Sequence, residues 1–321
     1  MVKTIPQLYR YIYHRAERAT EVGRFRTWAH QFTAGNLRPL MLEMRPDVVV
    51  CTHAFPCGAM AEYKTLFCDA PPVVAIVTDF AVHGFWIHEG VDRYVVSPDA
   101  MREAIVARGV EKEAIAVTGI PVRREFAYRA QSQSALRERL NLPQDRRIVL
   151  LMGGGLGIAP IEAMLAALQP VREPLAAVVI AGRNTRAARR LGDAAERLDF
   201  PVRTLGFVDN VYDYMHAADV LVTKPGGLTS SEALVAQLPM VLCRPLPGQE
   251  ERNARVLVES GAAVRSRRIE ELPGLVEMLL RDGKRRNEAI SAARRMGRPN
   301  AAAEAAAMIA GMVELRKEIV A

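Results

Sequence analysis

Short runs of apolar residues alternate with longer amphipathic segments along most of the chain. The apolar runs are residues 48–51, 73–77, 94–96, 147–152, 176–181, 220–222 and 240–242. Runs that are this short and apolar throughout are typical of strands buried on both faces of a parallel sheet, with helices between them. We therefore predict an α/β fold in which the alternation stops after the third run and restarts near Arg147.

A polar segment rich in arginine, residues 129–146, separates the two sets of strands. It is expected to connect two domains, and a chain of 321 residues is long enough for two α/β domains of ordinary size. We place the first domain at residues 1–142 and the second at residues 143–298. Residues 299–321 begin with a Pro-Asn helix start and continue into an alanine-rich tract, so a C-terminal helix that returns to the first domain is expected there.

The motif TKPGGLTSSE stands between an apolar strand and a helix that we expect to begin at Glu232. Pro225 and Gly226 end the strand and let backbone N–H groups approach a ligand. Thr229 and Ser230 add hydroxyl groups at the helix N-terminus, a combination that favours an anion. Glu232 is placed to accept hydrogen bonds from the paired hydroxyls of a ribose. The motif indicates a nucleotide diphosphate site, with a capped helix after a tight turn as the alternative.

A second glycine-rich loop, MGGGLG, follows the strand at residues 147–152. Its spacing differs from the dinucleotide fingerprint, because Ile158 stands where the third glycine belongs. The chain also lacks the lysine of a Walker A loop at the required spacing, so NAD-dependent enzymes and ATPases are disfavoured. Arg183 follows the next strand and offers a guanidinium group that can grip a diphosphate, or is a surface arginine.

A third loop, PLPGQEERN, follows the strand at residues 240–242. We expect it to be extended, and Gln249, Glu250 and Asn253 carry the amide and carboxylate groups that recognise sugar hydroxyls. All three loops follow strands, so they are expected to open on the same carboxyl edge of a parallel sheet.

The motifs MGGGLG, AGRN, LGFVDN, TKPGGLTSSEAL and PGQEERNA, in this order and spacing, resemble the donor half of family 28 glycosyltransferases. The likeness is strongest to the branch of monogalactosyldiacylglycerol synthases and processive diacylglycerol glucosyltransferases. RPDVVVCTHAFP, VVAIVTDFAVHGFWIHEGVDRYVVSP and VTGIPVRREF resemble its acceptor half. The resemblance implies the B-type glycosyltransferase architecture, with two Rossmann-like domains facing across a cleft. It also implies inverting transfer of a hexose from UDP-galactose or UDP-glucose to diacylglycerol, which makes a membrane glycolipid without a cofactor.

The resemblance also assigns contacts with the UDP-sugar to individual residues. It implies that Gly155 lies by the diphosphate, Phe207 by the uracil, Thr229 and Ser230 by the phosphates, Glu232 by the ribose, and Gln249 and Glu250 by the sugar.

One part of the family pattern is missing from the start of the sequence. Members of the branch begin with a strand and a Gly-Gly-Gly-His loop whose histidine is a candidate base, whereas this chain soon enters a basic helical stretch, residues 9–45. We therefore expect a misassigned start, a trimmed chain, a partner chain that supplies the loop, or a protein that works without it. A non-catalytic nucleotide-sugar-binding subunit and a transferase for a lipid-linked peptidoglycan precursor stay open as alternatives.

Inverting transfer needs a base for the acceptor hydroxyl, and the segment TDFAVHGFWIH offers candidates. Asp79 and His83 follow one buried strand and His53 follows the strand before it, so they are expected to share a cleft. The aromatic residues of the segment are expected to contact a glyceride or a sugar ring. A structural role for each histidine is the alternative. His83 and His88 are five residues apart rather than four, so no metal pair is expected.

The chain is basic, with a net charge of +7 and a pI near 9.4, which suits a nucleotide sugar or an acidic membrane surface. Nucleic acid is the weakest partner class, because aromatic residues make up only 6% and no nucleic-acid motif occurs. No apolar stretch approaches the ~20 residues that span a bilayer, and no signal peptide is seen. We expect a cytoplasmic protein, peripheral at the membrane face, whose basic and aromatic start lies on anionic lipid.

Overall fold

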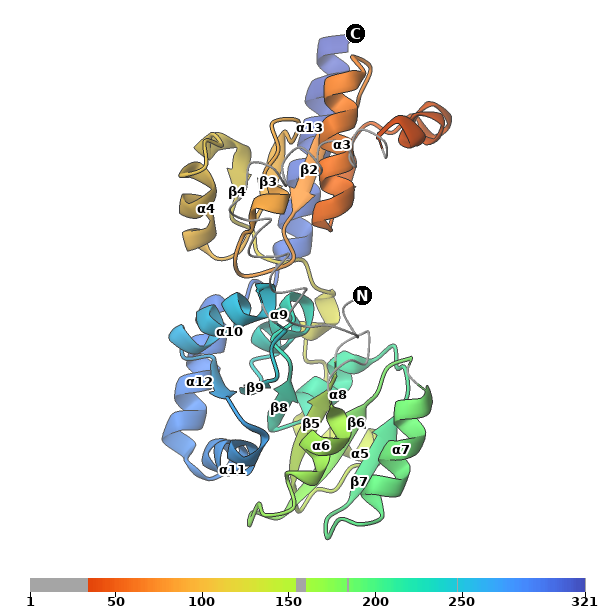
Figure 1. The fold of residues 1–321 in the computed structure, drawn as a ribbon. Coiled ribbons are helices and arrows are strands. Elements are labelled where there is room, and N and C mark those ends of the chain that lie inside the picture. Colours follow the sequence, from red (N-terminus) through yellow and green to blue (C-terminus); the bar gives the residue numbers. More distant parts are fainter. Residues whose placement is uncertain (1–33, 154–159, 184, 247, 321) are drawn as a thin grey trace. The chain divides into compact units, whose positions relative to one another are not determined.

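The computed structural model describes residues 34–153, 160–183, 185–246 and 248–320 (Figure 1). They form two compact units. The first contains the described part of Met1–Pro121, Pro247–Gln249 and Asn300–Ala321, and the second that of Val122–Leu246 and Glu250–Pro299. The basic stretch expected to lie on lipid therefore falls mostly outside the described residues, except for a helix at residues 34–44.

The first unit is built on a parallel sheet whose strand order is β1-β2-β3-β4. Its strands are β1 (Val49–Cys51), β2 (Val73–Ile76), β3 (Arg93–Val95) and β4 (Ile115–Ala116). Its labelled helices are α3 (Ala54–Leu66), α4 (Asp99–Val106) and α13 (Ala301–Val320), with the 3-10 turns η1 (Gly84–Trp86) and η2 (Lys112–Ala114).

The two faces of this sheet are covered by different helices, as the alternation of side chains along a strand requires. Val73 and Ala75 of β2 belong to the core that includes residues of α3 and α4. Val74 and Ile76 point to the other face, where they pack with Ala305 of α13. The C-terminal helix thus belongs to the first unit, although it follows the whole of the second unit in sequence (Figure 1).

The second unit is built on a larger parallel sheet whose strand order is β10-β9-β8-β5-β6-β7. Its strands are β5 (Arg147–Met152), β6 (Leu175–Ile180), β7 (Val202–Leu205), β8 (Val220–Thr223), β9 (Met240–Cys243) and β10 (Ala263–Ser266). Its helices are α5 (Gln133–Arg139), α6 (Ile161–Ala166), α7 (Thr185–Ala195), α8 (Val211–Ala217), α9 (Gly227–Val235), α10 (Gln249–Glu259), α11 (Leu272–Arg281) and α12 (Gly283–Met296), with the turns η3 (Arg124–Phe126) and η4 (Ile269–Glu271).

The boundary between the units lies earlier than residues 142–143, where the sequence places it. The segment expected to be a connector contains α5, which packs against α8 within the second unit. Arg137 of α5 is buried, donating to the carbonyl of Ala217 at 2.9 Å and to the carboxylate of Asp219 at 2.7 Å. The prediction that this polar segment connects two domains is therefore wrong for α5, because the buried Arg137 binds a carboxylate that is distant in sequence.

Asp219 connects four segments of the second unit and is only 1% exposed. Its carboxylate faces Arg137 at 2.7 Å, Arg147 at 3.4 Å and Arg286 at 3.0 Å. It also accepts the N–H of Ile148 at 2.7 Å, at the start of the central strand β5.

We predict that Asp219→Asn destabilises the protein by about 3–5 kcal/mol, because it leaves buried guanidinium charge uncompensated. Urea unfolding of the variant and the wild type measures this loss. Glu162→Gln is the matched control, since its partner Arg190 is 65% exposed and such a surface pair contributes only about 0–1 kcal/mol. Equal effects of the two substitutions would contradict a central role for Asp219.

Candidate functional site

The second sheet changes direction between β5 and β8. The chain runs from β5 outward through β6 and β7 on one side, then returns to place β8, β9 and β10 on the other. In open parallel sheets, ligands bind beyond the carboxyl ends of the strands at such a switch point. Here the two strands end at Met152 and Thr223, which are register partners, and the Thr223 hydroxyl donates to the Met152 carbonyl at 3.0 Å.

The chain turns at residues 224–226, which we call the glycine turn, and then enters α9. The helix begins at Gly227 rather than at Glu232, with Gly226 as N-cap residue at φ −74°. Gly226 has no side chain that could cap this end, so the N-cap residue leaves the first N–H groups of α9 to other acceptors. An uncapped helix N-terminus beside a switch point is a ready anion site.

Glu232 lies in the second turn of α9, so the prediction that it starts the helix is wrong. Burial raises the pKa of its carboxyl group to about 7, and the charge of Arg123 opposes this shift only in part. Thr229 is half-buried in the first turn, whereas Ser230 is fully buried and its hydroxyl has no hydrogen-bond partner among the described residues. Sequence reasoning missed Arg123, which is far from these motifs along the chain.

An arginine and an aromatic ring lie together beyond the ends of β6 and β7. The guanidinium of Arg183 is 4.8 Å from the ring centroid of Phe207, a cation–π distance. Phe207 is 57% exposed, so its ring presents a large apolar surface next to a positive charge. The motifs AGRN and LGFVDN therefore contribute to one surface feature.

The motif PGQEERNA braces the glycine turn. Glu250 pairs with Lys224 at 2.5 Å and accepts the N–H of Leu246 at 2.8 Å. Asn253 is fully buried and donates to the carbonyl of Pro225 at 3.2 Å. The loop was expected to be extended, but its second half forms α10, which turns these two side chains toward the glycine turn. Gly155, the remaining predicted contact of this unit, lies outside the described residues.

The candidate bases of the first unit have unequal surroundings. His53 is exposed, and its Nδ1 accepts the N–H of Phe55 at 3.3 Å, which caps α3. Asp79 and His83 are both buried, 4% and 6% exposed. Gln249, which groups with this unit, donates through its side-chain amide to the carboxylate of Asp79.

The aromatic residues around His83 belong to the core of the first unit. The imidazole lies 5.6 Å from the ring of Phe85 and 6.3 Å from that of Trp86, and Trp86 is only 2% exposed. Phe80 is 3% exposed. Trp86 and Phe80 are therefore too deeply buried to contact a glyceride or a sugar, contrary to the expectation from the sequence.

Comparison with known proteins identifies both halves of the chain. Residues 1–122 match the monogalactosyldiacylglycerol (MGDG) synthase family, and residues 132–296 match glycosyl transferases group 1. A processive diacylglycerol beta-glucosyltransferase of Bacillus licheniformis is 32% identical over 284 residues, which cover 88% of this chain and 73% of that protein. The chain therefore belongs to the glycosyltransferase family of the processive diacylglycerol beta-glucosyltransferases.

Solved structures with this fold support the architecture of the glycosyltransferase. Anabaena HepE in complex with UDP-glucose has a TM-score of 0.56 at 16% identity, covering 83% of this chain and 79% of that one. Acinetobacter baumannii MurG has a TM-score of 0.61 at 17% identity, covering 92% and 82%. The predicted B-type fold with its Rossmann-like α/β units is confirmed.

The raised pKa of Glu232 predicts a pH-dependent cost in stability. The folded protein holds the carboxyl proton up to about pH 7, whereas the unfolded chain releases it near its ordinary pKa of about 4.3. The wild-type protein therefore loses stability as the pH rises toward 7, because the unfolded chain has already released the proton. Glutamine has no proton to release, so the free energy of unfolding of Glu232→Gln relative to the wild type should increase by about 2 kcal/mol between pH 5 and pH 8.

Urea unfolding of both proteins at the two pH values measures this difference. Glu288→Gln serves as the control, because Glu288 is exposed on α12. A gain from Glu232→Gln that does not change with pH would show that the carboxyl group titrates normally.

Proposed function

We propose that this protein transfers a hexose from a UDP-sugar to diacylglycerol and so makes a membrane glycolipid. The observation that carries the proposal is the 32% identity to a processive diacylglycerol beta-glucosyltransferase over 88% of the chain. The similar proteins are glucosyltransferases, which favours UDP-glucose over UDP-galactose as donor. The peptidoglycan-precursor alternative finds support only in the fold of MurG, at 17% identity.

The UDP-sugar would bind at the switch point of the second unit. The uncapped amides of α9 suit the diphosphate, and Glu232 lies one turn further along the same helix, where it suits the ribose hydroxyls. Phe207 offers an exposed ring for the uracil, next to the Arg183 guanidinium. In this proposal the helix N-terminus stabilises the leaving diphosphate, so the reaction needs no metal ion or other cofactor.

The hydrogen bonds that support the glycine turn limit what Glu250 and Asn253 can contribute to binding the sugar. Both side chains already hold the turn, through Lys224 and the Pro225 carbonyl. We therefore propose that they position the donor amides, and that recognition of the sugar falls to backbone groups nearby.

We propose that Asp79 and His83 take part in deprotonating the acceptor hydroxyl. Both follow β2, whose carboxyl end is the ligand side of a parallel sheet, and both are buried. A hydrogen bond from Thr78 to the Thr52 carbonyl at 3.4 Å holds the ends of β1 and β2 together. His53 is the weaker candidate, because its ring nitrogen is engaged in capping α3.

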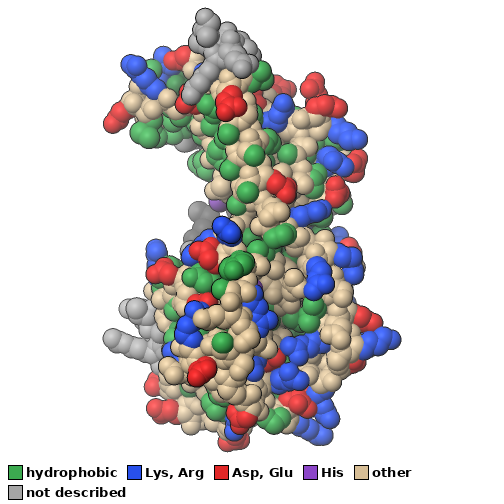
Figure 2. All heavy atoms as spheres, turned by 180° about the vertical axis from the view of Figure 1, so that it is seen from behind, with side chains coloured by type: hydrophobic (Ala, Val, Ile, Leu, Met, Phe, Trp, Pro, Cys, Tyr) green, Lys and Arg blue, Asp and Glu red, His purple; other side chains and the backbone are tan. Residues whose placement is uncertain are grey.

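The substrate implies work at a membrane surface, and we propose peripheral association with anionic lipid on the cytoplasmic side. No helix in the described part of the chain has the length and apolar character needed to cross a bilayer. Large apolar side chains reach the surface of the first unit, among them Leu42, Met44 and Phe55. Figure 2 shows hydrophobic side chains at the surface of this unit among acidic and basic ones.

We predict that Glu232→Ala weakens UDP binding by about 1.5–3 kcal/mol, through loss of a charge-assisted hydrogen bond. Gly226→Ala should weaken it by roughly tenfold, because the added methyl group would stand in the path of the diphosphate. The methyl group meets no atom within 4 Å in the protein itself, so the fold should tolerate it. Calorimetry with UDP measures both effects. Gly274→Ala is the control, since its Cβ also meets nothing within 4 Å.

A transfer assay tests the reaction. Incubation with UDP-glucose or UDP-galactose and vesicles containing diacylglycerol should yield hexosyl diacylglycerol, faster on anionic than on neutral vesicles. His83→Ala and Asp79→Asn should lower turnover by ~10² to 10⁴ and leave UDP affinity unchanged. Asp69→Asn, at an exposed residue of the same unit, is the control. Normal turnover in both site variants would place the base elsewhere.

A further inference from the structure

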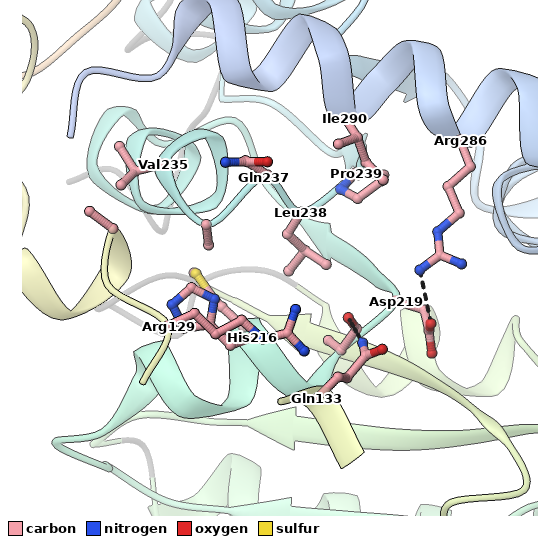
Figure 3. A pocket seen from close by; sticks show the side chains of 14 residues that line it. Arg129, Gln133, His216, Asp219, Val235, Gln237, Leu238, Pro239, Arg286 and Ile290 are labelled. Carbon is pink, nitrogen blue, oxygen red and sulfur yellow. Dashed lines mark hydrogen bonds and ion pairs between the residues drawn. The ribbon is translucent and has the colours of Figure 1, made fainter. Parts of the chain in front are cut away.

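The second unit contains a cavity of about 310 Å³ away from the glycine turn (Figure 3). Its lining includes Ala218 and Asp219, which precede β8, and Leu238 and Pro239, which precede β9. These residues mark the amino edge of the sheet, whereas the glycine turn follows the carboxyl edge. The cavity is therefore separate from the site proposed for the UDP-sugar, and no motif discussed above accounts for it.

The polar lining of the cavity comes from both of its sides. Figure 3 shows Arg129, Gln133 and His216 on one side and Gln237 on the other, with Arg286 reaching from α12 to Asp219. Gln133 is fixed by hydrogen bonds to the carbonyls of Ala217 and Ala218, at 3.3 Å and 3.0 Å. Gln133, His216 and Arg286 are held by the helices α5, α8 and α12, whereas Arg129 lies in the segment before α5 and Gln237 in the turn after α9.

Positive charge exceeds negative charge around this cavity. Asp219 is the acidic residue of the lining, and its carboxylate is already shared by the guanidinium groups of Arg137, Arg147 and Arg286. Arg129 adds another cation, which donates a hydrogen bond to the carbonyl of Gln131 at 3.2 Å.

Arg286 supplies a second, independent observation. Its Nε is buried and has no hydrogen-bond partner among the described residues. The Nε itself has no accessible surface, so a ligand in the cavity would meet the remaining, partly exposed part of the Arg286 guanidinium group, whose side chain is 23% exposed. Guanidinium groups that are not saturated by carboxylates are suited to bind phosphate, through paired N–H donors.

The remaining walls of the cavity are apolar, formed by side chains such as Met215, Val235, Leu238 and Ile290. A volume of 310 Å³ is at the lower end of the range for small-molecule sites and corresponds to about ten water-sized volumes. It suits a compact ligand and is too small for a lipid with two acyl chains.

We propose that this cavity is a second ligand site that binds a small, soluble organic phosphate with an apolar body. The phosphate group lies between Arg129 and Arg286, and the apolar body lies against Leu238 and Ile290. This site goes beyond the proposed transfer reaction and does not depend on it.

Calorimetry with phenyl phosphate as the probe tests the proposal on the full chain. Wild-type protein should bind the probe saturably, with one site per chain at this position. Arg129→Gln should weaken binding by about tenfold or more through the loss of a charged contact, and it should fold normally because Arg129 is exposed. Ile290→Phe should also weaken binding, because the larger side chain fills the cavity.

Matched variants locate the site. Arg172→Gln removes the same charge from an exposed position outside the cavity, and Glu232→Ala alters the site proposed for UDP; both should bind phenyl phosphate like the wild type. Absence of saturable binding at millimolar probe, or equal affinity of the wild type and Arg129→Gln, would overturn the proposal. Binding only to vesicles of a phosphate-monoester lipid, lost in Arg129→Gln, would overturn the assignment of a soluble ligand.

Discussion

The structure of the second unit depends on the ion pairs and hydrogen bonds made by one buried carboxylate, that of Asp219. Asp219 has lost its hydration, and a charge in that position is tolerated only when it is paired and hydrogen-bonded. The partners come from α5, β5 and α12, each at least 67 residues from Asp219 in sequence. Their convergence fixes the amino edges of β5 and β8, the two strands that flank the switch point. The geometry at the carboxyl edge follows from this, because β5 and β8 stay in register from Val149 and Val220 to Met152 and Thr223.

Much of the fold was predictable from the apolar runs alone. Residues 147–152 coincide with β5, whose residues 148–152 are buried and apolar, as a strand covered on both faces requires. The start of α9 was not predictable in this way. Glycine is favoured just past the C-terminal end of a helix, yet Gly227 is the first residue of this one, because Gly226 takes the N-cap position and Pro225 ends the preceding strand. Local propensity misplaced the boundary by favouring Glu232.

The candidate site shows the same division between local pattern and long-range pairing. The sequence indicated three loops at one sheet edge, which follows from strand direction alone. It gave no means of finding that Lys224 pairs with Glu250, or that Asn253 supports the Pro225 carbonyl. These contacts join two polar motifs. The polar side chains of each motif, taken alone, are equally consistent with contacting a ligand and with supporting the glycine turn. Only the packing of α10 separates the two roles.

The carboxyl group of Glu232, with its pKa of about 7, is about half protonated in neutral solution. Ribose hydroxyls that donate to this group favour its ionised form, so a nucleotide that binds there displaces the remaining proton into the solvent. Nucleotide affinity then increases as the solution becomes more alkaline through neutrality. The heat of binding also acquires a contribution from the buffer that takes up the proton, and titrations in buffers of different ionisation enthalpy would differ by that amount.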